Sequence, residues 1–386
     1  MKICAFADTY LPTTGGAQTV LHNLATQLTT HGDHFSVLAP FVRGRDNRLS
    51  TKYSVDRYHS PLTKRFGVRQ LLVPLGWHYL RHRFDVLHCH SAYPCAYVAA
   101  TFKRVLGIPF VVRPYGGDVL PESRVCRHPR LRSRVRASLE AADVVIAQGH
   151  FLRDVIRDLG VPDEKIQIVN NGVDLEVFSR GTPFPHPCPY LLGMGNLVRR
   201  KGFDLLIQAY AKARPSDVDL LIAGDGIERE KLEKIAAESG VASRIRFLGR
   251  VEGQTKIDVY RSAVCAICPS RSEPFSNVIL EALASGLPVI ASATGGNFEQ
   301  VKHGEHGLIV PTEDVGALAN AITTILSEPQ LLNQFRAKVP AFIQRFDWPQ
   351  VALQYRAIYE SVLGQRVTGP VREPERIQSL KVLANK

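Results

Sequence analysis

Two carboxylates lie eight residues apart in the segment SEPFSNVILEALASGLPVIAS, residues 272–292. Glu273 precedes a proline, whereas Glu281 lies among apolar side chains of a predicted helix that begins near Ser276 and ends at Gly286. A carboxylate in such surroundings needs hydrogen-bond donors, because burial without them is costly. The hydroxyls of a sugar diol would supply such donors, and so would an internal lysine or arginine; the sequence leaves both partners open.

The first turn of the same helix offers a second binding group. Its backbone N–H groups have no partner within the helix, and the helix dipole adds positive charge there. We therefore expect this turn to receive an anionic or hydroxyl-rich ligand.

Three consecutive cations lie in YLLGMGNLVRRKGFDLLIQAY, residues 190–210. The loop between a predicted strand and the helix that begins after Gly202 presents Arg199, Arg200 and Lys201 at the carboxyl end of the strand. Cations in that position suit a diphosphate. The glycines of GMGNLV resemble half of a dinucleotide fingerprint, but the third glycine is missing.

A pair of glycines, Gly15 and Gly16, follows the first predicted strand and opens the first predicted helix. A backbone without Cβ atoms approaches a ligand closely, which favours a binding role. A tight turn alone would also select glycine, and the sequence does not decide between the two.

The elements that position these groups alternate between strands and helices. Apolar runs that alternate with helix-period segments such as GGAQTVLHNLATQLTTHG predict parallel sheets covered by helices on both faces. The predicted strands are residues 2–8, 34–40, 85–90, 109–118 and 143–149 in the first part of the chain, and 190–196, 219–226, 245–251, 264–270, 287–292 and 307–311 in the second. Four prolines and a glycine make residues 178–190 a predicted linker between the two parts.

The fold class expected from this pattern is α/β, with two doubly wound Rossmann-like domains that face each other across a cleft. Ligands in such folds bind beyond the carboxyl ends of the strands. We expect an N-terminal domain over residues 1–180 and a C-terminal domain over residues 181–345. A C-terminal helix over residues 346–364 is expected to pack back on the N-terminal domain, and residues 365–386 to form a tail.

Length and composition exclude several classes of protein. A chain of 386 residues with 45% apolar composition favours two domains. No apolar run is long enough to span a membrane, and the N-terminus has no signal-peptide pattern, so we expect a cytoplasmic protein.

Seven scattered cysteines do not indicate a disulfide framework, and the pair Cys265 and Cys268 is interpreted as part of a buried strand rather than as a redox or zinc motif. No acid cluster or His/Cys set with metal-ligand spacing is evident, so no metal is expected.

Positive charge is concentrated in the first half of the chain. Residues 1–180 contain 24 Lys and Arg and 15 Asp and Glu, and therefore carry nine of the twelve net positive charges. The arginines of residues 124–136 are expected to form one surface, beside the aromatic and basic residues of 69–84. Such a surface suits an anionic membrane, although a solvated basic face has the same composition. The residues assigned to the membrane surface are Trp77, Arg81, Arg83, Arg130, Arg132, Arg134 and Arg136. No nucleic-acid partner is expected, because neither a binding motif nor stacking aromatics accompany the charge.

In combination, these motifs resemble those of a known family. A glycine pair near the N-terminus is followed by DVLHCH, VNNGVD, GNLVRRKG, GDG, FLGRV, EPFSNVILEALASGLPVIAS and TGG. This order resembles the retaining nucleotide-sugar transferases of glycosyltransferase family 4, also called group 1, which have the two-domain GT-B fold. The resemblance covers roughly residues 1–364.

The resemblance implies roles for individual residues. Glu281, the second acid of the E-x7-E pair, would bind the ribose hydroxyls of the donor, and Glu273 would lie beside the donor sugar. Free amides from Phe275 to Asn277 would meet the sugar and diphosphate, and Lys201 would neutralise the leaving diphosphate. The implied donor-binding residues are Gly15, Gly16, Asn196, Arg199, Arg200, Lys201, Arg250, Glu273, Phe275, Ser276, Asn277 and Glu281. The implied catalytic residues are Lys201, Glu273, His90 and Tyr115, and those on the acceptor side are His90, Tyr115 and Asp118.

Two positions depart from the pattern of the family. The family usually has an arginine five residues before the lysine, whereas this chain has Asn196, for which Arg199 or Arg200 would have to substitute. Many members have a histidine before the glycine in the segment that matches RPYGGDV, whereas this chain has Tyr115. His90 and Asp118 match the family.

The implied reaction moves a hexosyl group from a nucleoside-diphosphate sugar to an acceptor hydroxyl with retention at the anomeric carbon. Its transition state resembles an oxocarbenium ion separating from a diphosphate, so the main task is to stabilise the leaving charge. The sugar nucleotide is a substrate, no cofactor or metal is expected, and the acceptor would be a lipid-linked or cell-envelope glycan at the inner face of the membrane. A sugar-nucleotide epimerase, a phosphorylase and a non-catalytic nucleotide-sugar-binding subunit remain alternatives on the same architecture.

Overall fold

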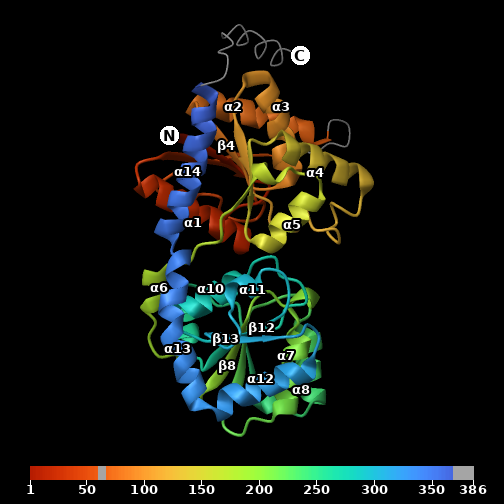
Figure 1. Ribbon diagram of the computed structural model, residues 1–386, viewed down its shortest axis with the longest axis vertical. Helices are drawn as coiled ribbons and strands as arrows, with labels where there is room; N and C mark the ends of the chain where they lie inside the picture. The colour runs from red at the N-terminus through yellow and green to blue at the C-terminus, as the bar shows by residue number, and fades with distance from the viewer. Residues whose placement is uncertain (60–66, 368–386) are drawn as a thin grey trace. The chain divides into compact units, whose positions relative to one another are not determined.

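The computed structural model describes residues 1–59 and 67–367, which fold into two compact units. The first unit comprises Met1–Gln148, Leu152–Asn170 and the chain from Pro349, and the second comprises Gly149–Phe151 and Asn171–Trp348. Each unit is built on a parallel β-sheet with helices packed on both of its faces (Figure 1). The sequence-based expectation of two doubly wound α/β domains is therefore confirmed.

The sheet of the first unit has its strands in the order β3-β2-β1-β4-β5-β6-β7, and every neighbouring pair is parallel. The strands are β1 (Lys2–Phe6), β2 (His34–Pro40), β3 (Ser54–Tyr58), β4 (Val86–Cys89), β5 (Phe110–Val112), β6 (Val144–Ala147) and β7 (Ile166–Ile168). β4, β5 and β6 are buried along their whole length, as the continuous apolar runs predict for strands covered on both faces. The chain order reverses between β1 and β4, which is where ligands bind in doubly wound sheets.

Helices connect the strands of the first unit, and their bounds follow the apolar periodicity of the sequence. They are α1 (Gly16–Thr30), α2 (Leu72–His82), α3 (Tyr97–Leu106), α4 (Pro129–Ala141) and α5 (His150–Asp158), with short helical turns η1 (Gly67–Leu71), η2 (Ala92–Ala96) and η3 (Asp163–Lys165). α3 ends at Gly107, whose left-handed conformation closes the last turn.

The C-terminal helix α14 (Trp348–Val367) packs within the first unit from Pro349 onward. The Tyr359 hydroxyl lies 2.7 Å from Nδ1 of His88, and Arg113 lies over the ring of Tyr355 at 5.6 Å. Buried aromatic side chains of α14 therefore complete the core of a unit whose other elements end far earlier in the sequence. Most of the expected tail, residues 368–386, lies outside the described residues.

The sheet of the second unit has the order β10-β9-β8-β11-β12-β13, again with parallel pairs only. The strands are β8 (Tyr190–Met194), β9 (Asp219–Ala223), β10 (Ile245–Gly249), β11 (Cys265–Cys268), β12 (Val289–Ser292) and β13 (Gly307–Val310). The order reverses between β8 and β11, so the second unit has its own ligand-binding position at the carboxyl ends of these two strands.

The helices of the second unit include a short first helix, α6, which follows the boundary between the units. The helices are α6 (Leu175–Ser179), α7 (Phe203–Ala213), α8 (Arg229–Glu238), α9 (Gly253–Arg261), α10 (Asn277–Ala284), α11 (Asn297–Gln300), α12 (Val315–Ser327) and α13 (Pro329–Ile343), with turns η4 (Arg199–Lys201), η5 (Ala242–Arg244) and η6 (Gln344–Phe346). None of the helices in the described part of the chain has the length and apolar character needed to cross a membrane.

Two apolar layers flank the second sheet, and alternate residues of β8 point into different layers. Leu191 packs with Leu206 on one face, whereas Leu192 packs with Ile279 on the other. Cys265 and Cys268 are buried free thiols in these two opposite layers. The interpretation of this cysteine pair as part of a buried strand is confirmed.

The expected boundary at residues 180/181 and the expected linker over 178–190 differ from the observed division. The second unit already begins at Asn171, because Val173 donates to the carbonyl of Phe346 in the same unit. The proline-rich segment lies along α9: the N–H of Thr182 donates to Asp258 Oδ1 at 2.7 Å, and that of Phe184 donates to Ser262 Oγ at 2.7 Å. Proline limits regular structure in this segment, but its backbone still bonds to the second unit.

Candidate active site

The candidate donor site lies where the second sheet reverses its strand order. The chain leaving β8 forms turn η4, which carries Lys201, and the chain leaving β11 carries Glu273. Because β8 and β11 are neighbouring parallel strands, their carboxyl ends bring these two loops together. Residues from distant parts of the sequence thereby share one position in the fold.

Lys201 and Glu273 form an ion pair at this position. The Lys201 ammonium donates to Oε2 of Glu273, and the two side chains are only 13% and 7% exposed. Nη1 of Arg200 lies 3.9 Å from the other carboxylate oxygen of Glu273 and 3.5 Å from the carbonyl of Ser272. Two cations and one carboxylate, two of the three largely shielded from water, make a site where charges interact strongly.

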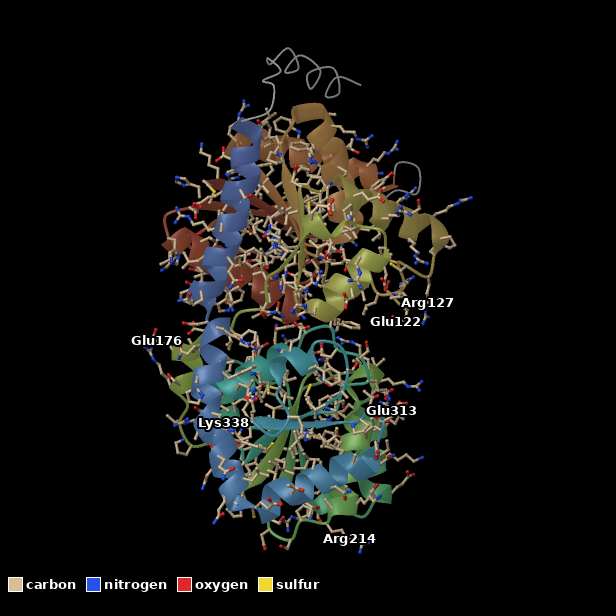
Figure 2. The ribbon with its side chains drawn as sticks, in the orientation of Figure 1. Glu122, Arg127, Glu176, Arg214, Glu313 and Lys338 are labelled. Carbon is tan, nitrogen blue, oxygen red and sulfur yellow. The ribbon has the colours of Figure 1, made fainter. Side chains whose placement is uncertain are left out.

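Arg271 fixes the loop that carries these cations. Its guanidinium donates to both carboxylate oxygens of Asp204 at 2.8 Å, to the carbonyl of Arg199 at 2.9 Å, and through Nε to Glu313 at 2.5 Å. Glu313 is labelled in Figure 2. These hydrogen bonds raise the pKa of Arg271, the bond to Asp204 most of all. Arg271 could not be selected from the sequence, because an arginine in a loop has the same local pattern whether it is solvated or holds several carboxylates and carbonyls.

Glycine is required at two positions that bring the loops together. Gly202, between η4 and α7, has φ +70°, and a Cβ there would overlap the carbonyl of Pro269. Gly295 of the TGG motif has φ +49°, and a Cβ there would overlap the carbonyl of Glu273. The TGG loop therefore packs directly on the backbone of the acidic residue, which a larger residue would prevent.

Glu281 has partners within the protein. This agrees with one of the two alternatives left open by the sequence, an internal cation. Its carboxylate accepts from Lys256 Nζ at 2.5 Å and from the Tyr260 hydroxyl at 2.9 Å, both on α9. Each carboxylate oxygen has two acceptor positions, and these contacts use one on each. The side chain remains 12% exposed. The internal ion pair thus leaves acceptor capacity for a further donor.

The expectation of free amides from Phe275 to Asn277 is wrong at Ser276. The Ser276 N–H donates to Oε1 of Gln300 at 2.8 Å, and Nε2 of Gln300 donates back to the Ser276 carbonyl at 2.7 Å. Ser276 precedes α10 as expected, but its side chain makes no capping hydrogen bond. Phe275 is buried, and the Asn277 side chain accepts from Asn171 at 2.6 Å. Gln300 satisfies the amide instead, and no motif in the sequence points to this residue.

The remaining predicted donor residues of the second unit lie near the surface. Asn196 and Arg199 are exposed, and Arg250 forms an ion pair with Glu252 at 2.6 Å. The contacts among the described residues connect Arg200, but not these three side chains, to the Lys201–Glu273 pair.

The predicted acceptor-side residues come together in the first unit, beyond β4 and β5. Nδ1 of His90 lies 2.8 Å from the Tyr115 hydroxyl, and the two rings stack. Asp118 holds the segment by accepting from the N–H of Ala92 at 2.6 Å and of Tyr115 at 3.0 Å. His90, Tyr115 and Asp118 therefore form one network, as their shared assignment requires.

Burial sets the protonation states in this network. It lowers the pKa of His90 well below the usual value and raises the pKa of Tyr115 to about 12. Arg113 hydrogen-bonds to Tyr115, so the tyrosine O–H is directed to His90 Nδ1 and the neutral ring carries its proton on Nε2. That Nε2 is buried and has no hydrogen-bond partner among the described residues. The network presents one unsatisfied N–H donor.

Gly15 and Gly16 lie in the first unit at the beginning of α1. Gly15 has φ 175°, an extended conformation that any residue adopts. The tight-turn explanation for this glycine is therefore not supported. The amide side chain of Gln18 occupies the space beside Gly15 instead.

The predicted membrane residues lie on two helices of the first unit. On α2, Trp77 is 68% exposed, and Val73 and Leu80 are also exposed at spacings that place all three on one side of the helix. On α4, Arg130 and Arg134 lie on one flank and Arg132 and Arg136 on the other, because the spacing of two residues turns the helix by about 200°. All four arginines are exposed, and the single arginine surface expected for residues 124–136 stays a prediction.

Two of the four α4 arginines have local partners. Arg134 lies 5.4 Å from the ring of Tyr97 and Arg136 pairs with Glu140 at 2.7 Å. On α2 and just beyond it, Arg81 lies 3.6 Å from Asp56, and Arg83 covers the ring of Tyr79.

Comparison with known proteins identifies the family. The chain matches Glycosyltransferase Family 4 over residues 14–177 and Glycosyl transferases group 1 over residues 176–341. It is 34% identical over 373 residues to the phosphatidyl-myo-inositol mannosyltransferase of Mycolicibacterium smegmatis, which covers 91% of each chain. The chain therefore belongs to the family 4, group 1 glycosyltransferases, and it is an enzyme of that class.

Solved structures show the same architecture. The sucrose-phosphate synthase of Thermosynechococcus elongatus matches 95% of this chain and 100% of its own, with a TM-score of 0.82 and 23% identity. The Anabaena protein HepE, in complex with UDP-glucose, matches 94% and 100% with a TM-score of 0.78 and 21% identity. The two sheets are the two domains of the GT-B fold, so this part of the sequence-based expectation is confirmed.

Proposed function

We propose that this glycosyltransferase moves a hexosyl group from a nucleoside-diphosphate sugar to an acceptor hydroxyl with retention at the anomeric carbon. The observation that carries the proposal is the Lys201–Glu273 pair at the strand-order reversal of the second unit. A cation held there by the fold is positioned for a diphosphate, because parallel sheets bind ligands beyond the carboxyl ends of these strands.

Lys201 is assigned to the leaving diphosphate. Its ammonium has three N–H donors, and the contact with Glu273 uses one of them. Two donors therefore remain for phosphate oxygens, and Arg200 adds a second cation near the same carboxylate. The attraction grows as negative charge develops on the diphosphate, so it acts mainly on the transition state.

Glu273 and Glu281 are assigned to the rest of the donor. Glu273, held by Lys201 and packed under the TGG loop, would accept hydrogen bonds from the donor sugar. Glu281 would accept from the ribose hydroxyls, with Lys256 and Tyr260 holding the carboxylate in its orientation. The amides of Phe275 and Asn277, together with Asn196, Arg199, Arg250, Gly15 and Gly16, complete the proposed donor set.

The acceptor is assigned to the network of the first unit. The unsatisfied Nε2–H of His90 is a suitable donor to a sugar or acceptor hydroxyl, because a buried N–H without a partner is costly. Tyr115 orients the ring and fixes its tautomer, and Asp118 holds the loop. Tyr115 is thus a positioning residue for His90 in this proposal.

We further propose a cytoplasmic enzyme that binds the anionic inner face of the membrane and acts on a lipid-linked or cell-envelope glycan. The exposed apolar side of α2, formed by Val73, Trp77 and Leu80, supports this together with Arg81 and Arg83. Apolar side chains flanked by arginines suit the boundary between lipid headgroups and acyl chains.

Donor profiling tests the proposal. UDP-, GDP- and ADP-sugars are added separately, and a donor that binds the folded enzyme raises the melting temperature by mass action. The best donor is then incubated with candidate acceptors, and the anomeric configuration of the product is determined by NMR. Retention with release of nucleoside diphosphate supports the proposal, whereas inversion, or epimerised donor formed without acceptor, contradicts it.

The transfer is proposed to need no metal, because Lys201 and Arg200 supply the positive charge that a divalent ion would otherwise provide. Turnover with the identified donor should therefore be unchanged when Mg²⁺ or Mn²⁺ is added to the EDTA-treated enzyme. A requirement for either ion would contradict this part of the proposal.

A further inference from the structure

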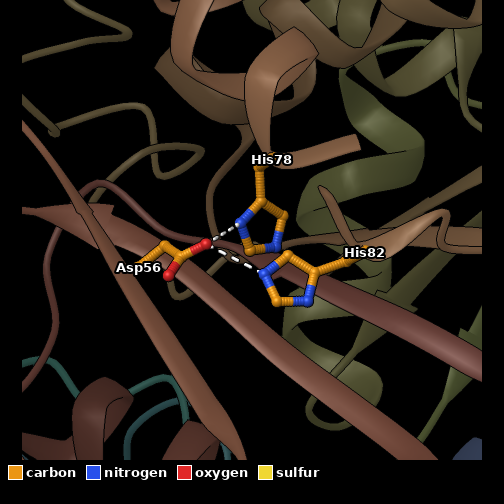
Figure 3. A group of neighbouring side chains, drawn as sticks. All are labelled: Asp56, His78 and His82. Carbon is orange, nitrogen blue, oxygen red and sulfur yellow. Dashed lines mark hydrogen bonds and ion pairs between the residues drawn. The ribbon is translucent and has the colours of Figure 1, made fainter. Parts of the chain in front are cut away.

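Asp56, His78 and His82 meet in the first unit at a position with no role in the proposed transfer (Figure 3). His78 and His82 lie one turn apart on α2 and therefore project from the same side of the helix. Asp56, on strand β3, points between the two rings: its Oδ2 lies 3.0 Å from Nδ1 of His78 and 2.9 Å from Nε2 of His82.

The three donor atoms have a spacing that suits a metal ion. They all lie within 4.8 Å of one another. Nitrogen and oxygen ligands stand about 2.0–2.2 Å from Zn²⁺, so two ligands of a tetrahedral site are about 3.4 Å apart. The carboxylate oxygen would need to move by only a few tenths of an ångström from each ring, a displacement well within side-chain flexibility.

The surroundings of His78 give each of its ring nitrogens a hydrogen-bond partner. Without a metal, Nδ1–H donates to the Asp56 carboxylate at 3.0 Å. The Ser36 oxygen lies 3.0 Å from Nε2 and 3.3 Å from the carbonyl of Ile3. When a metal takes Nδ1, the ring carries its proton on Nε2 and donates it to the Ser36 oxygen. A bond from the second ring N–H to a neighbouring oxygen is also what metal-binding histidines usually have.

The site borders a pocket and lies near cationic side chains. Of the three proposed ligands, His82 lines a surface pocket of 330 Å³, together with Arg81, Lys2 and Lys52. Solvent therefore reaches His82 through this pocket. Nη1 of Arg81 lies 3.6 Å from Oδ1 of Asp56, the oxygen that does not contact the histidines. This guanidinium competes with a metal for the carboxylate, but its side chain is exposed and free to move into water.

We propose that Asp56, His78 and His82 bind one Zn²⁺ ion, with water from the pocket as the fourth ligand. Two imidazoles and a carboxylate suit zinc, whereas Mg²⁺ and Ca²⁺ prefer ligand sets made of oxygen alone. The ion would connect α2 to the edge strand β3, and so hold the helix that carries Trp77. The site goes beyond the proposed transfer and has no part in its chemistry. The site could not be recognised from the sequence, because Asp56 is distant in the sequence from the i, i+4 histidine pair.

Zinc binding by the untagged full-length chain tests the proposal. The protein is stripped with EDTA, freed of chelator, and dialysed against graded Zn²⁺; bound zinc is measured by mass spectrometry and the melting temperature is recorded. Wild type should bind about one equivalent and melt at a higher temperature with zinc, because the ion binds the folded state. Asp56→Asn and His82→Gln should each weaken binding by about tenfold or more, and Ser36→Ala by about tenfold.

His186→Gln is the matched control. His186 also pairs with an aspartate, Asp219, at 2.8 Å, but no second histidine joins that pair, so zinc binding should be unchanged. Arg81→Gln should tighten binding, because it removes the competing cation. Melting temperatures and circular dichroism of all variants in EDTA establish that each one folds. Failure of folded wild type to bind zinc, or equal binding by wild type, Asp56→Asn and His82→Gln, would overturn the proposal.

Discussion

At the scale of single residues, the candidate donor site consists of charged groups held by other charged groups. Lys201 and Glu273 could be selected from their residue types and from their place after apolar runs. Arg271 and Gln300 could not, because what distinguishes them is a set of partners far away in the sequence: Asp204 and Glu313 for the arginine, and the Ser276 backbone for the glutamine. Such partners become visible only when the chain is folded.

The first residue-scale prediction separates the two roles of Glu281. Glu281→Gln should weaken donor binding by about tenfold, since a hydrogen bond to a charged group contributes about 1.5–3 kcal/mol. Lys256→Gln removes the internal ion pair but leaves the carboxylate, so it should lower the melting temperature with a smaller effect on donor binding. Calorimetric titration with the identified donor measures the donor affinity of each variant, and thermal denaturation measures its melting temperature. If the two variants lose similar stability and neither loses donor affinity, Glu281 is only an internal partner of Lys256.

The second residue-scale prediction concerns Arg271. Arg271→Lys cannot contact both oxygens of Asp204 together with the Arg199 carbonyl, because an ammonium lacks the planar fork of a guanidinium. We expect the free energy of unfolding to fall by about 1–3 kcal/mol, measured by urea denaturation. Arg153→Lys is the control: Arg153 pairs with Asp163 at an exposed site, and its change should be below about 1 kcal/mol. Equal effects of the two substitutions would show that Arg271 does not fix the loop.

At the scale of elements, apolar runs predicted most strands. Two strands with few apolar residues were not predicted. The predicted strand at 85–90 is observed as β4, with His90 just beyond its end. β3 was missed because SVDRY at the sheet edge has no apolar run, and β7 because its sequence IQI has a polar residue between two apolar ones and gives no apolar run either. The missed strand β3 supplies Asp56 to the proposed zinc site. Local pattern therefore located the active-site loops but not the edge of the sheet.

The element-scale prediction concerns α2. Changing Val73, Trp77 and Leu80 to Ser should reduce sedimentation with anionic liposomes, because binding scales with the apolar area that enters the headgroup region. Ile227→Ser, which removes another exposed apolar residue in the second unit, should bind as wild type does. A variant with Arg130, Arg132, Arg134 and Arg136 changed to Ser should lose binding only in part, since these arginines lie on two flanks of α4. Binding by the α2 variant at the wild-type level would remove this helix as a membrane contact.

At the scale of the whole molecule, each unit repeats the same arrangement: a parallel sheet whose chain order reverses near its middle, with the assigned residues at that reversal. The alternation of strands and helices was sufficient to predict this architecture. The C-terminal helix was also expected on the first unit, and α14 packs there through Tyr355 and Tyr359. The boundary between the units was not predicted correctly, because Val173 hydrogen-bonds to Phe346, a partner that no local pattern in the sequence reveals. The order of the motifs was sufficient to identify the family. The contacts between residues distant in the sequence could not be predicted in this way.

The pH dependence of stability is a property of the whole molecule. Burial lowers the pKa of His88 to about 3 and that of His306 to about 4, from an ordinary value of 6.5. Below about pH 6.5 the unfolded chain binds protons that the folded chain excludes, so stability falls as the pH falls toward 4. The melting temperature should decrease over that interval, and His306→Gln should make the decrease smaller. A melting temperature that rises between pH 6.5 and 4 would contradict this prediction.

The central claim is that Lys201 stabilises the departing diphosphate, and the direct test is the kinetics of Lys201→Ala beside Lys201→Arg. The identified donor and acceptor are used, with donor affinity measured separately by calorimetry. Because the interaction strengthens as the bond to the sugar breaks, Lys201→Ala should lower kcat by about 10²–10³-fold while weakening donor binding much less, and Lys201→Arg should recover part of the loss. Turnover of Lys201→Ala equal to that of wild type, or a loss confined to donor affinity, would contradict the claim.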